Sequence, residues 1–571
     1  MDNQRLLVWA TFGLLLYLNY QAWVKDYRLI PDSQGVPVVE EPTKDVDELG
    51  PPELPSERQS SQETAVSSPT LDEFSPVRRA KGAETIYVTT DVLDLEINTK
   101  GGTLERAQLL GYPVAKDQPN VLVELLSSVP SELGLIQTGL NSAGSGPKAN
   151  HTAEYDVRIN QFELGSLDRV VVPMTWTDGL GITVEKTLTF TRGSYRIDID
   201  HRISNQSDSD WRGAEYAQII RRLRQQERSM FDVDSYSFDG PLVYDGQKSE
   251  KFDEDDLASD SPNFRAMNGW LASIEHHFLS AIIPPEDIEY VYDLSLRRDS
   301  TLASFIRTPS IVVRPGEDYL FETTVFVGPK LQLQLEEITE KLKLTVDYGW
   351  LTILSQPLFW LLSLAYSILK NWGGAIIAVT ILIKLVFYKL TEASGRSMAK
   401  MREIQPRMKS LQDRYKDDRQ ALSQAMMELY KREKVNPAAG CLPILIQMPF
   451  FLAFYWVLLE SVEMRQAPFA LWITDLSSRD PFFILPIIMG AAMLFQQKLN
   501  PTPGDPIQAR VMQIMPIMFT GFFAFFPSGL VLYWVTNTVL SIAQQWYINK
   551  VVHEEALAKK GRKQKKGKDA S

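Results

Sequence analysis

Two patterns of apolar residues divide this chain into different kinds of structure. Between residues 84 and 330, apolar positions alternate with polar ones, as they do at Leu93, Leu95 and Ile97. Glycine-containing turns, such as the one ending at Gly102, separate the alternating runs. After residue 372 the apolar residues instead form long, almost uninterrupted stretches. The period of two predicts an antiparallel β-sandwich with polar outer faces, and the long stretches predict membrane-spanning helices.

The apolar stretches predict six spans. The first, Leu6 to Val24, is about nineteen uncharged residues long, which suits the thickness of a bilayer. No small-residue cleavage site follows it, so it is expected to remain as a signal anchor. The other five spans are predicted at 373–390, 441–461, 481–496, 511–526 and 529–549. Two of them contain only about fifteen apolar residues each, Phe482 to Phe495 and Met512 to Phe526, and should thin the bilayer locally.

The segments between the spans have patterns of their own. Residues 25–83 are rich in Pro, Ser and acidic residues, which predicts a flexible tether. Residues 331–372 are predicted to form a connector and an amphipathic helix in the membrane interface, although 349–369 is apolar enough to span. The predicted domains are therefore an anchor (1–24), the tether (25–83), a β domain (84–330), the connector (331–372), a five-span core (373–549) and a basic tail (550–571).

A charged helical hairpin, 391–435, is predicted between the second and third spans. Its arms carry apolar residues every three or four positions, including a methionine stripe that favours packing over ligand binding. The cations expected to make contacts are Arg396, Lys400, Arg402, Arg407, Lys409 and Arg414. Although the formal net charge is −12, the hairpin and tail are basic, so the positive-inside rule places both in the cytoplasm. Six spans then put the N-terminus there too, with the β domain on the far side.

Lys384 is the most unusual residue of the predicted spans, because it puts a charge inside the apolar run from Ala375 to Tyr388. A charge in a span is a functional-site hypothesis by default. The alternative is that Lys384 snorkels to the interface near Lys389 and has no function. Other polar residues of the predicted spans are Thr380, Gln447, Gln513, Thr520, Trp534, Thr536 and Asn537. Because Thr380 and Lys384 are four residues apart, they share a helix face, which favours a hydrated cavity over isolated interhelical hydrogen bonds.

The sequence offers little to support catalysis. It has no GxSxG, Walker or HExxH motif, and its single cysteine, Cys441, cannot form an internal disulfide. The adjacent His276 and His277 would point to opposite faces of a strand, a poor arrangement for a metal. We therefore predict no catalytic residue, no metal and no cofactor.

Short motifs in the second half of the chain resemble the YidC/Oxa/Alb family of membrane protein insertases, in its Gram-negative form. These motifs are Ser397-Met-Ala-Lys-Met401, Glu433-Lys-Val-Asn-Pro437, Gly440-Cys-Leu-Pro443, Ile446-Gln-Met-Pro449, Leu459-Glu-Ser-Val-Glu463, Arg465-Gln-Ala-Pro-Phe-Ala-Leu-Trp472, Asp475-Leu476 and Phe526-Pro-Ser-Gly-Leu530. The resemblance implies a hydrophilic groove that receives polar parts of a nascent membrane protein. It assigns Lys384, Thr380, Gln447 and Trp534 to that groove, with Lys384 where the best-known relatives have Arg. Gln513, Thr520, Thr536 and Asn537 are further candidates for its polar lining.

The resemblance also implies a location and partners. The protein is expected in the bacterial inner membrane, with the β domain in the periplasm and both termini in the cytoplasm. The expected partners are nascent membrane proteins, the Sec translocon with its accessory subunits, membrane lipids, and ribosomes and targeting factors at the hairpin and tail. Two rival functions stay open: a solute transporter that uses the buried lysine, or an anchored periplasmic carbohydrate-binding module. Transporters usually contain internal repeats, and none is evident here.

Overall fold

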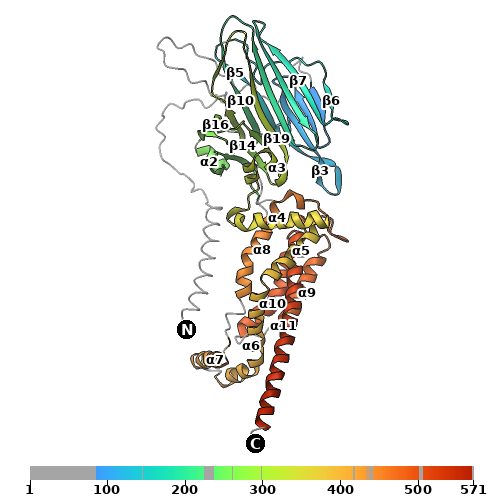
Figure 1. Cartoon of the computed structure of the whole chain (residues 1–571), viewed down its shortest axis with the longest axis vertical. Helices are drawn as coiled ribbons and strands as arrows, with labels where there is room; N and C mark the ends of the chain where they lie inside the picture. Colours follow the sequence, from blue (N-terminus) through green and yellow to red (C-terminus); the bar gives the residue numbers. More distant parts are fainter. Residues whose placement is uncertain are drawn as a thin grey trace, which may run out of the picture. The chain divides into compact units, whose positions relative to one another are not determined.

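A computed structural model of the chain describes residues 85–568, apart from 145, 224–236, 260, 298, 416–417, 434, 436–441 and 500–505. The predicted anchor and tether lie outside the described residues. Figure 1 shows a domain of strands, which corresponds to the predicted β domain, and a set of helices.

The β domain contains two sheets, as the alternating pattern predicts. Neighbouring strands pair antiparallel, apart from β1 and β6, which are parallel. The eleven-stranded sheet has the order β13-β16-β17-β10-β5-β3-β2-β1-β6, with β4 beside β3 and β18 beside β10. Its strands are β1 (Thr85–Thr89), β2 (Leu93–Asn98), β3 (Thr103–Ala115), β4 (Gln118–Leu126), β5 (Gly134–Ser142), β6 (Gln161–Glu163), β10 (Trp211–Arg222), β13 (Asn263–Met267), β16 (Glu289–Leu296), β17 (Thr301–Arg307) and β18 (Ile311–Val313).

The second sheet has eight strands in the order β12-β11-β14-β15-β19-β9-β8-β7. These are β7 (Arg169–Thr177), β8 (Ile182–Thr191), β9 (Arg196–Asn205), β11 (Gly240–Tyr244), β12 (Ser249–Lys251), β14 (Trp270–Glu275), β15 (Phe278–Ile283) and β19 (Asp318–Pro329). His276 and His277 lie in the turn between β14 and β15 rather than in a strand, which corrects the prediction for this pair. The described part of the domain also contains two short helices, η2 (Pro130–Glu132) and α2 (Glu254–Ser259).

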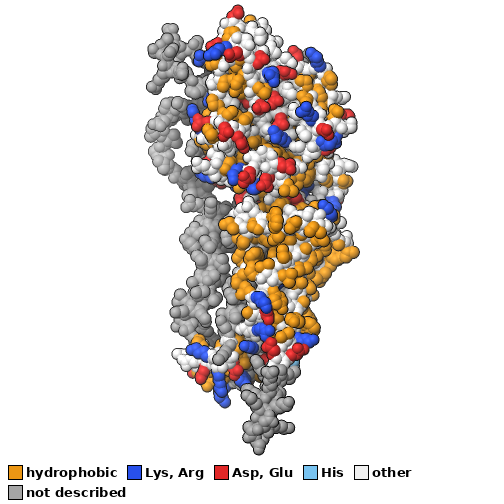
Figure 2. All heavy atoms as spheres, viewed as in Figure 1, with side chains coloured by type: hydrophobic (Ala, Val, Ile, Leu, Met, Phe, Trp, Pro, Cys, Tyr) orange, Lys and Arg blue, Asp and Glu red, His pale blue; other side chains and the backbone are white. Residues whose placement is uncertain are grey.

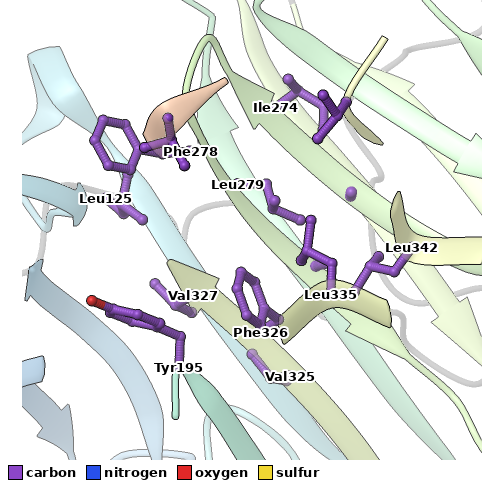
Figure 3. Close-up of a cluster of buried hydrophobic side chains, with 14 of the residues drawn as sticks. Leu125, Tyr195, Ile274, Phe278, Leu279, Val325, Phe326, Val327, Leu335 and Leu342 are labelled. Atoms are coloured by element: carbon purple, nitrogen blue, oxygen red, sulfur yellow. The ribbon is translucent and has the colours of Figure 1, made fainter. Parts of the chain in front are cut away.

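The connector after β19 forms three short helices, α3 (Gln332–Ile338), η4 (Glu340–Thr345) and η5 (Gly349–Leu351). Figure 3 shows Leu335 of α3 and Leu342 of η4 in a buried cluster with Phe326 of β19. All three side chains have 0% exposure. The connector therefore packs onto the eight-stranded sheet through Leu335 and Leu342, whereas Leu333 of α3 is 71% exposed.

The remaining helices overlap the predicted apolar stretches, but α11 continues to Lys568, past the predicted end of the last span at 549, and α10 begins at Pro506, before the predicted 511. They are α4 (Thr352–Leu369), α5 (Trp372–Val386), α6 (Tyr388–Arg414), α7 (Arg419–Glu433), α8 (Leu442–Glu460), η7 (Val462–Met464), α9 (Ile484–Leu499), α10 (Pro506–Phe523) and α11 (Ser528–Lys568). Hydrophobic side chains cover most of the visible surface of the described helices outside the hairpin (Figure 2). Within the described residues, α4 is long and apolar enough to cross a membrane by itself, and α5 with α6 would add a second span bent by 68°. Helix α5, which corresponds to the predicted span 373–390, ends at Val386, four residues before the predicted end, where the chain bends into α6.

Helices α6 and α7 form the predicted hairpin, and their apolar stripes pack against each other. Ile404, Met408 and Val435 make a small core, against which further apolar residues pack. Those residues are Met401, Met426, Leu429 and Tyr430. Asp418 caps α7 by accepting hydrogen bonds from the backbone N–H groups of Gln420 and Ala421. The methionine stripe thus serves largely as packing within the hairpin.

Candidate functional site

Helix α5 carries Lys384 in its last turn, and contacts at its first turn hold the helix in place. The Asn371 side chain accepts a hydrogen bond of 2.8 Å from Gly374 N, which caps the helix. The same side chain donates to Phe469 O at 2.9 Å, in the loop before α9. Because α5 also packs against α4 and α11, its rotation is fixed, and this decides which neighbours Lys384 meets.

The ammonium of Lys384 meets α11. Its Nζ donates a hydrogen bond of 2.7 Å to Ser541 Oγ, and Lys384 is only 8% exposed. The Ser541 hydroxyl donates its single hydrogen to Asn537 O at 2.7 Å, so toward Lys384 it can only accept a hydrogen bond. An ammonium has three N–H groups, and two of those on Lys384 have no hydrogen-bond partner within the described part of the chain. No described carboxylate forms an ion pair with it either.

Thr380 lies one turn before Lys384 on the same face of α5, as its spacing predicts. It is 2% exposed, and its hydroxyl donates to Ile376 O at 2.6 Å. The hydroxyl hydrogen is therefore used within the helix, which leaves Thr380 as a hydrogen-bond acceptor only. Together the two residues make a polar strip on the buried side of α5.

The candidates on α11 have different surroundings. Trp534 is half-buried in an aromatic cluster, with ring centroids 4.8 Å from Phe451 and 5.2 Å from Phe523. Thr536 donates to Leu532 O of its own helix. Asn537 is connected to Lys384 through Ser541. In this arrangement Trp534 supplies apolar surface, whereas Asn537 and Ser541 extend the polar strip.

The candidates on α8 and α10 are not hydrogen-bonded to Lys384. Gln447 is half-buried and Gln513 is exposed. Thr520 donates to Pro516 O at 2.7 Å, and its side chain lies against Gly490 of α9. Thr520 therefore marks a close approach of two helices, and the structure does not gather these three residues around the ammonium within its described part.

Ser541 is the residue that sequence reasoning missed, although a signal for it exists. Trp534, Asn537 and Ser541 are spaced by three and four residues, so they share one face of α11. A lone serine in an apolar helix usually bonds to its own backbone, and Ser541 does this as well. Its second role becomes visible only when α5 is packed beside α11.

The hairpin cations divide into paired and unpaired groups. Arg396 forms ion pairs with Glu392 and with Glu555 of α11, at 3.1 and 3.0 Å, and Arg407 pairs with Glu433 at 2.6 Å. The other four are exposed and form no ion pair with any described residue, namely Lys400, Arg402, Lys409 and Arg414. These four cations are therefore exposed on the hairpin without a described ion-pair partner.

The β domain contains a buried polar group of Lys186, His201 and Glu215. Lys186 and His201 are 0% exposed and Glu215 is 2% exposed, and His201 Nδ1 lies 2.8 Å from Glu215 Oε1. Burial lowers the pKa of Lys186 to about 7 and also lowers the pKa of His201. The group lies inside the domain, and its three side chains are almost fully buried. No set of three or more His, Cys, Asp and Glu is placed to hold a metal ion among the described residues.

Comparisons with known proteins cover the whole length of the chain. A family model described as the YidC periplasmic domain matches residues 85–361, and one described as 60Kd inner membrane protein matches residues 364–555. A relative named membrane protein insertase YidC, from Nitrosococcus oceani, is 45% identical over 97% of this chain and 100% of its own length. A relative with the same name from Thioalkalivibrio sulfidiphilus is 46% identical over 98% and 100%. One from Coxiella burnetii is 40% identical over 100% of both chains.

Two solved structures are also similar. A crystal structure of an active YidC insertase with its first transmembrane domain resolved has a TM-score of 0.39 and 19% identity, covering 83% of this chain and 94% of that one. A putative aldose 1-epimerase from Escherichia coli K12 has a TM-score of 0.28 and 10% identity, covering 43% of this chain and 99% of that one.

Proposed function

The chain belongs to the YidC family of membrane protein insertases, and we propose that Lys384 is the group that attracts acidic client segments as they cross the membrane. Members of this family are inner-membrane proteins with a periplasmic domain. The observation that carries the proposal is a nearly buried ammonium whose partner is a neutral hydroxyl.

The chemistry of this pair supports a binding role. A buried charge is normally paired with an opposite charge, because desolvation without a partner is unfavourable. The Ser541 hydroxyl satisfies one N–H of Lys384 and leaves the positive charge unneutralised. The last turn of α5 also favours a cation, because the C-terminal end of a helix carries partial negative charge. A client carboxylate or backbone carbonyl would satisfy the two remaining N–H groups.

The proposal includes a topology and a set of partners. Six spans would place both termini and the hairpin in the cytoplasm and the β domain in the periplasm. The polar strip of α5 and α11 would belong to a groove that opens to the cytoplasm and to lipid. The groove would act alone or beside the Sec translocon. The four exposed hairpin cations, with the basic tail, suit contacts with the phosphates of a ribosome or with an acidic targeting factor.

The test is a series of substitutions at Lys384 in a strain depleted of its own insertase. Insertion is scored for one client with an acidic translocated tail and for one with a neutral tail. Lys384→Arg should be tolerated because the charge survives. Lys384→Ala should impair the acidic client more than the neutral one, and Lys384→Glu should be worst because it repels the same carboxylates.

Lys389→Ala is the matched control, since Lys389 is an exposed lysine of the next helix that pairs with Glu392. It should leave both clients unaffected. Equal insertion of the acidic client by the Ala and Glu variants, at equal protein levels, would overturn the electrostatic role. Crosslinks from positions 380, 384, 447 and 534 to a stalled nascent chain would then show whether a groove works through its other polar groups.

A further inference from the structure

The loop before α9 presents three large apolar side chains to the outside. Leu471 is 87% exposed, Phe482 is 63% exposed and Phe483 is 41% exposed. We call these three residues the apolar knob. Contiguous apolar groups on a protein surface generally mark a contact with lipid or with another molecule.

A buried carboxylate holds the two halves of the knob together. Asp480 is 1% exposed, and its Oδ1 accepts hydrogen bonds from Trp472 Nε1 at 3.1 Å and from Phe482 N at 3.0 Å. Its Oδ2 accepts from Leu485 N at 2.7 Å, at the start of α9. One side chain therefore fixes the turn that carries Leu471 and the turn that carries the two phenylalanines. The knob is a built feature of the fold.

The backbone of the knob is strained at two of its three residues. Leu471 and Phe483 both have φ of 55°, in the left-handed region that bulky side chains rarely adopt. Such strain persists only where the surrounding structure imposes it, and it gathers at functional positions. Here the strain keeps two apolar side chains pointing away from the protein.

The knob continues the exposed apolar stripe of α9. Ile487, Ile488, Leu494 and Phe495 are 60, 41, 42 and 56% exposed and recur at helical spacing. In a family of inner-membrane proteins, such a stripe faces lipid. Phe482 and Phe483 precede α9 and continue the stripe beyond the N-terminal end of the helix. From this continuity we infer that the apolar knob inserts into the interfacial layer of the bilayer, at the membrane surface where α9 begins.

The rest of the loop has the composition that this location requires. Trp472 is half-buried with its indole N–H bonded, and Thr474, Ser478 and Arg479 are exposed. Aromatic and aliphatic groups beside hydroxyls and an arginine are typical of segments that lie in the headgroup region. The knob would thereby fix the depth of α9 and of the N-terminal end of α5, which bonds to the same loop through Asn371.

Site-directed spin labelling tests this location in the intact protein. Cys441 is the single cysteine, so a Cys441→Ser background accepts one label at a time. The labelled variants are Leu471→Cys and Phe482→Cys, with Ser478→Cys as the matched polar control and Ile487→Cys as the lipid reference. Each is reconstituted without client into phosphatidylethanolamine–phosphatidylglycerol vesicles, and the collision rates of the label with oxygen and with a water-soluble nickel chelate are measured.

The expected result is a higher ratio of oxygen to nickel collisions at 471 and 482 than at 478, close to the ratio at 487. Ratios at both knob positions equal to that at 478 would overturn the inference. Ratios that rise only after a stalled nascent chain is added would also overturn it, because they would assign the knob to a client. The two labels are independent, so loss of folding in one variant leaves the other as the test.

Discussion

Lys186 should make the β domain more stable as the pH rises from 7 to 9. The residue is on β8 of the eight-stranded sheet and is 0% exposed. Its Nζ donates to Gly101 O at 2.6 Å, Gly102 O at 3.2 Å and Thr138 O at 3.2 Å. Thr138 is on β5 of the other sheet, so this lysine joins the two sheets through backbone carbonyls. Burial lowers the pKa of Lys186 to about 7, whereas its ordinary value is 10.5.

The sign of the effect follows from proton binding. Between pH 7 and 10.5 the unfolded chain holds a proton on Lys186 more fully than the folded chain does, so raising the pH favours folding. The full slope is about 1.4 kcal/mol per pH unit. Since the folded group is half-titrated near pH 7, the free energy of unfolding should rise by about 2 kcal/mol between pH 7 and pH 9.

Pulse proteolysis in urea measures this free energy for the β domain within the full chain in detergent. Lys186→Met is the control, because it keeps the apolar stem and removes the titrating group. The three carbonyls then lose their donor, which should destabilise the variant by about 1–3 kcal/mol for each group left unpaired. The decisive quantity is the difference in pH dependence between the two proteins. The same rise in stability from pH 7 to 9 in wild type and variant would refute the reasoning.

Three further predictions concern the helices. Ser541→Ala should lower insertion of acidic clients less than Lys384→Ala does, because it removes one hydrogen bond of about 1.5–3 kcal/mol but keeps the charge. Ser541→Thr should restore insertion. Unchanged insertion by Ser541→Ala would contradict a role for the hydrogen bond between Ser541 and Lys384. Deleting residues 396–434 should abolish insertion in cells, and unchanged insertion would show that the hairpin contacts are dispensable. Gly490→Leu should lower the thermal stability of the protein in detergent by about 1–3 kcal/mol, because the added side chain meets Thr520 across α9 and α10, and Gly490→Ala should have a smaller effect.

The β domain could be predicted from sequence because its signal is local. Alternating residues such as Leu93, Leu95 and Ile97 are 1% exposed or less and lie in strand β2. The order of the strands within each sheet could not be predicted from this local pattern. β10 lies between β5 and β17, and nothing in a period of two specifies which strand will be its neighbour. Long-range pairing depends on how the whole sheet closes.

The helical half shows the same division between local and non-local information. The apolar stretches predict α8 and α9 to within a few residues and the start of α11 to within one, but α11 continues to Lys568, well past the predicted end of the last span at 549. The bend at Phe387 was not predicted, because its sequence contains neither Gly nor Pro at that point. The partner of Lys384 was not predicted either, since Ser541 is 157 residues away and meets it only through the packing of α5 on α11.

The identity of that partner carries the main argument about function. An aspartate or glutamate at position 541 would neutralise Lys384 and occupy its N–H groups, and the site would then have little attraction for a client. A serine instead holds the ammonium by one hydrogen bond and leaves its charge available. An arginine in place of Lys384 would bind carboxylates through a planar fork, whereas the lysine acts as a compact point charge. A point charge held from one side suits brief, geometrically undemanding contacts with client segments of different sequence.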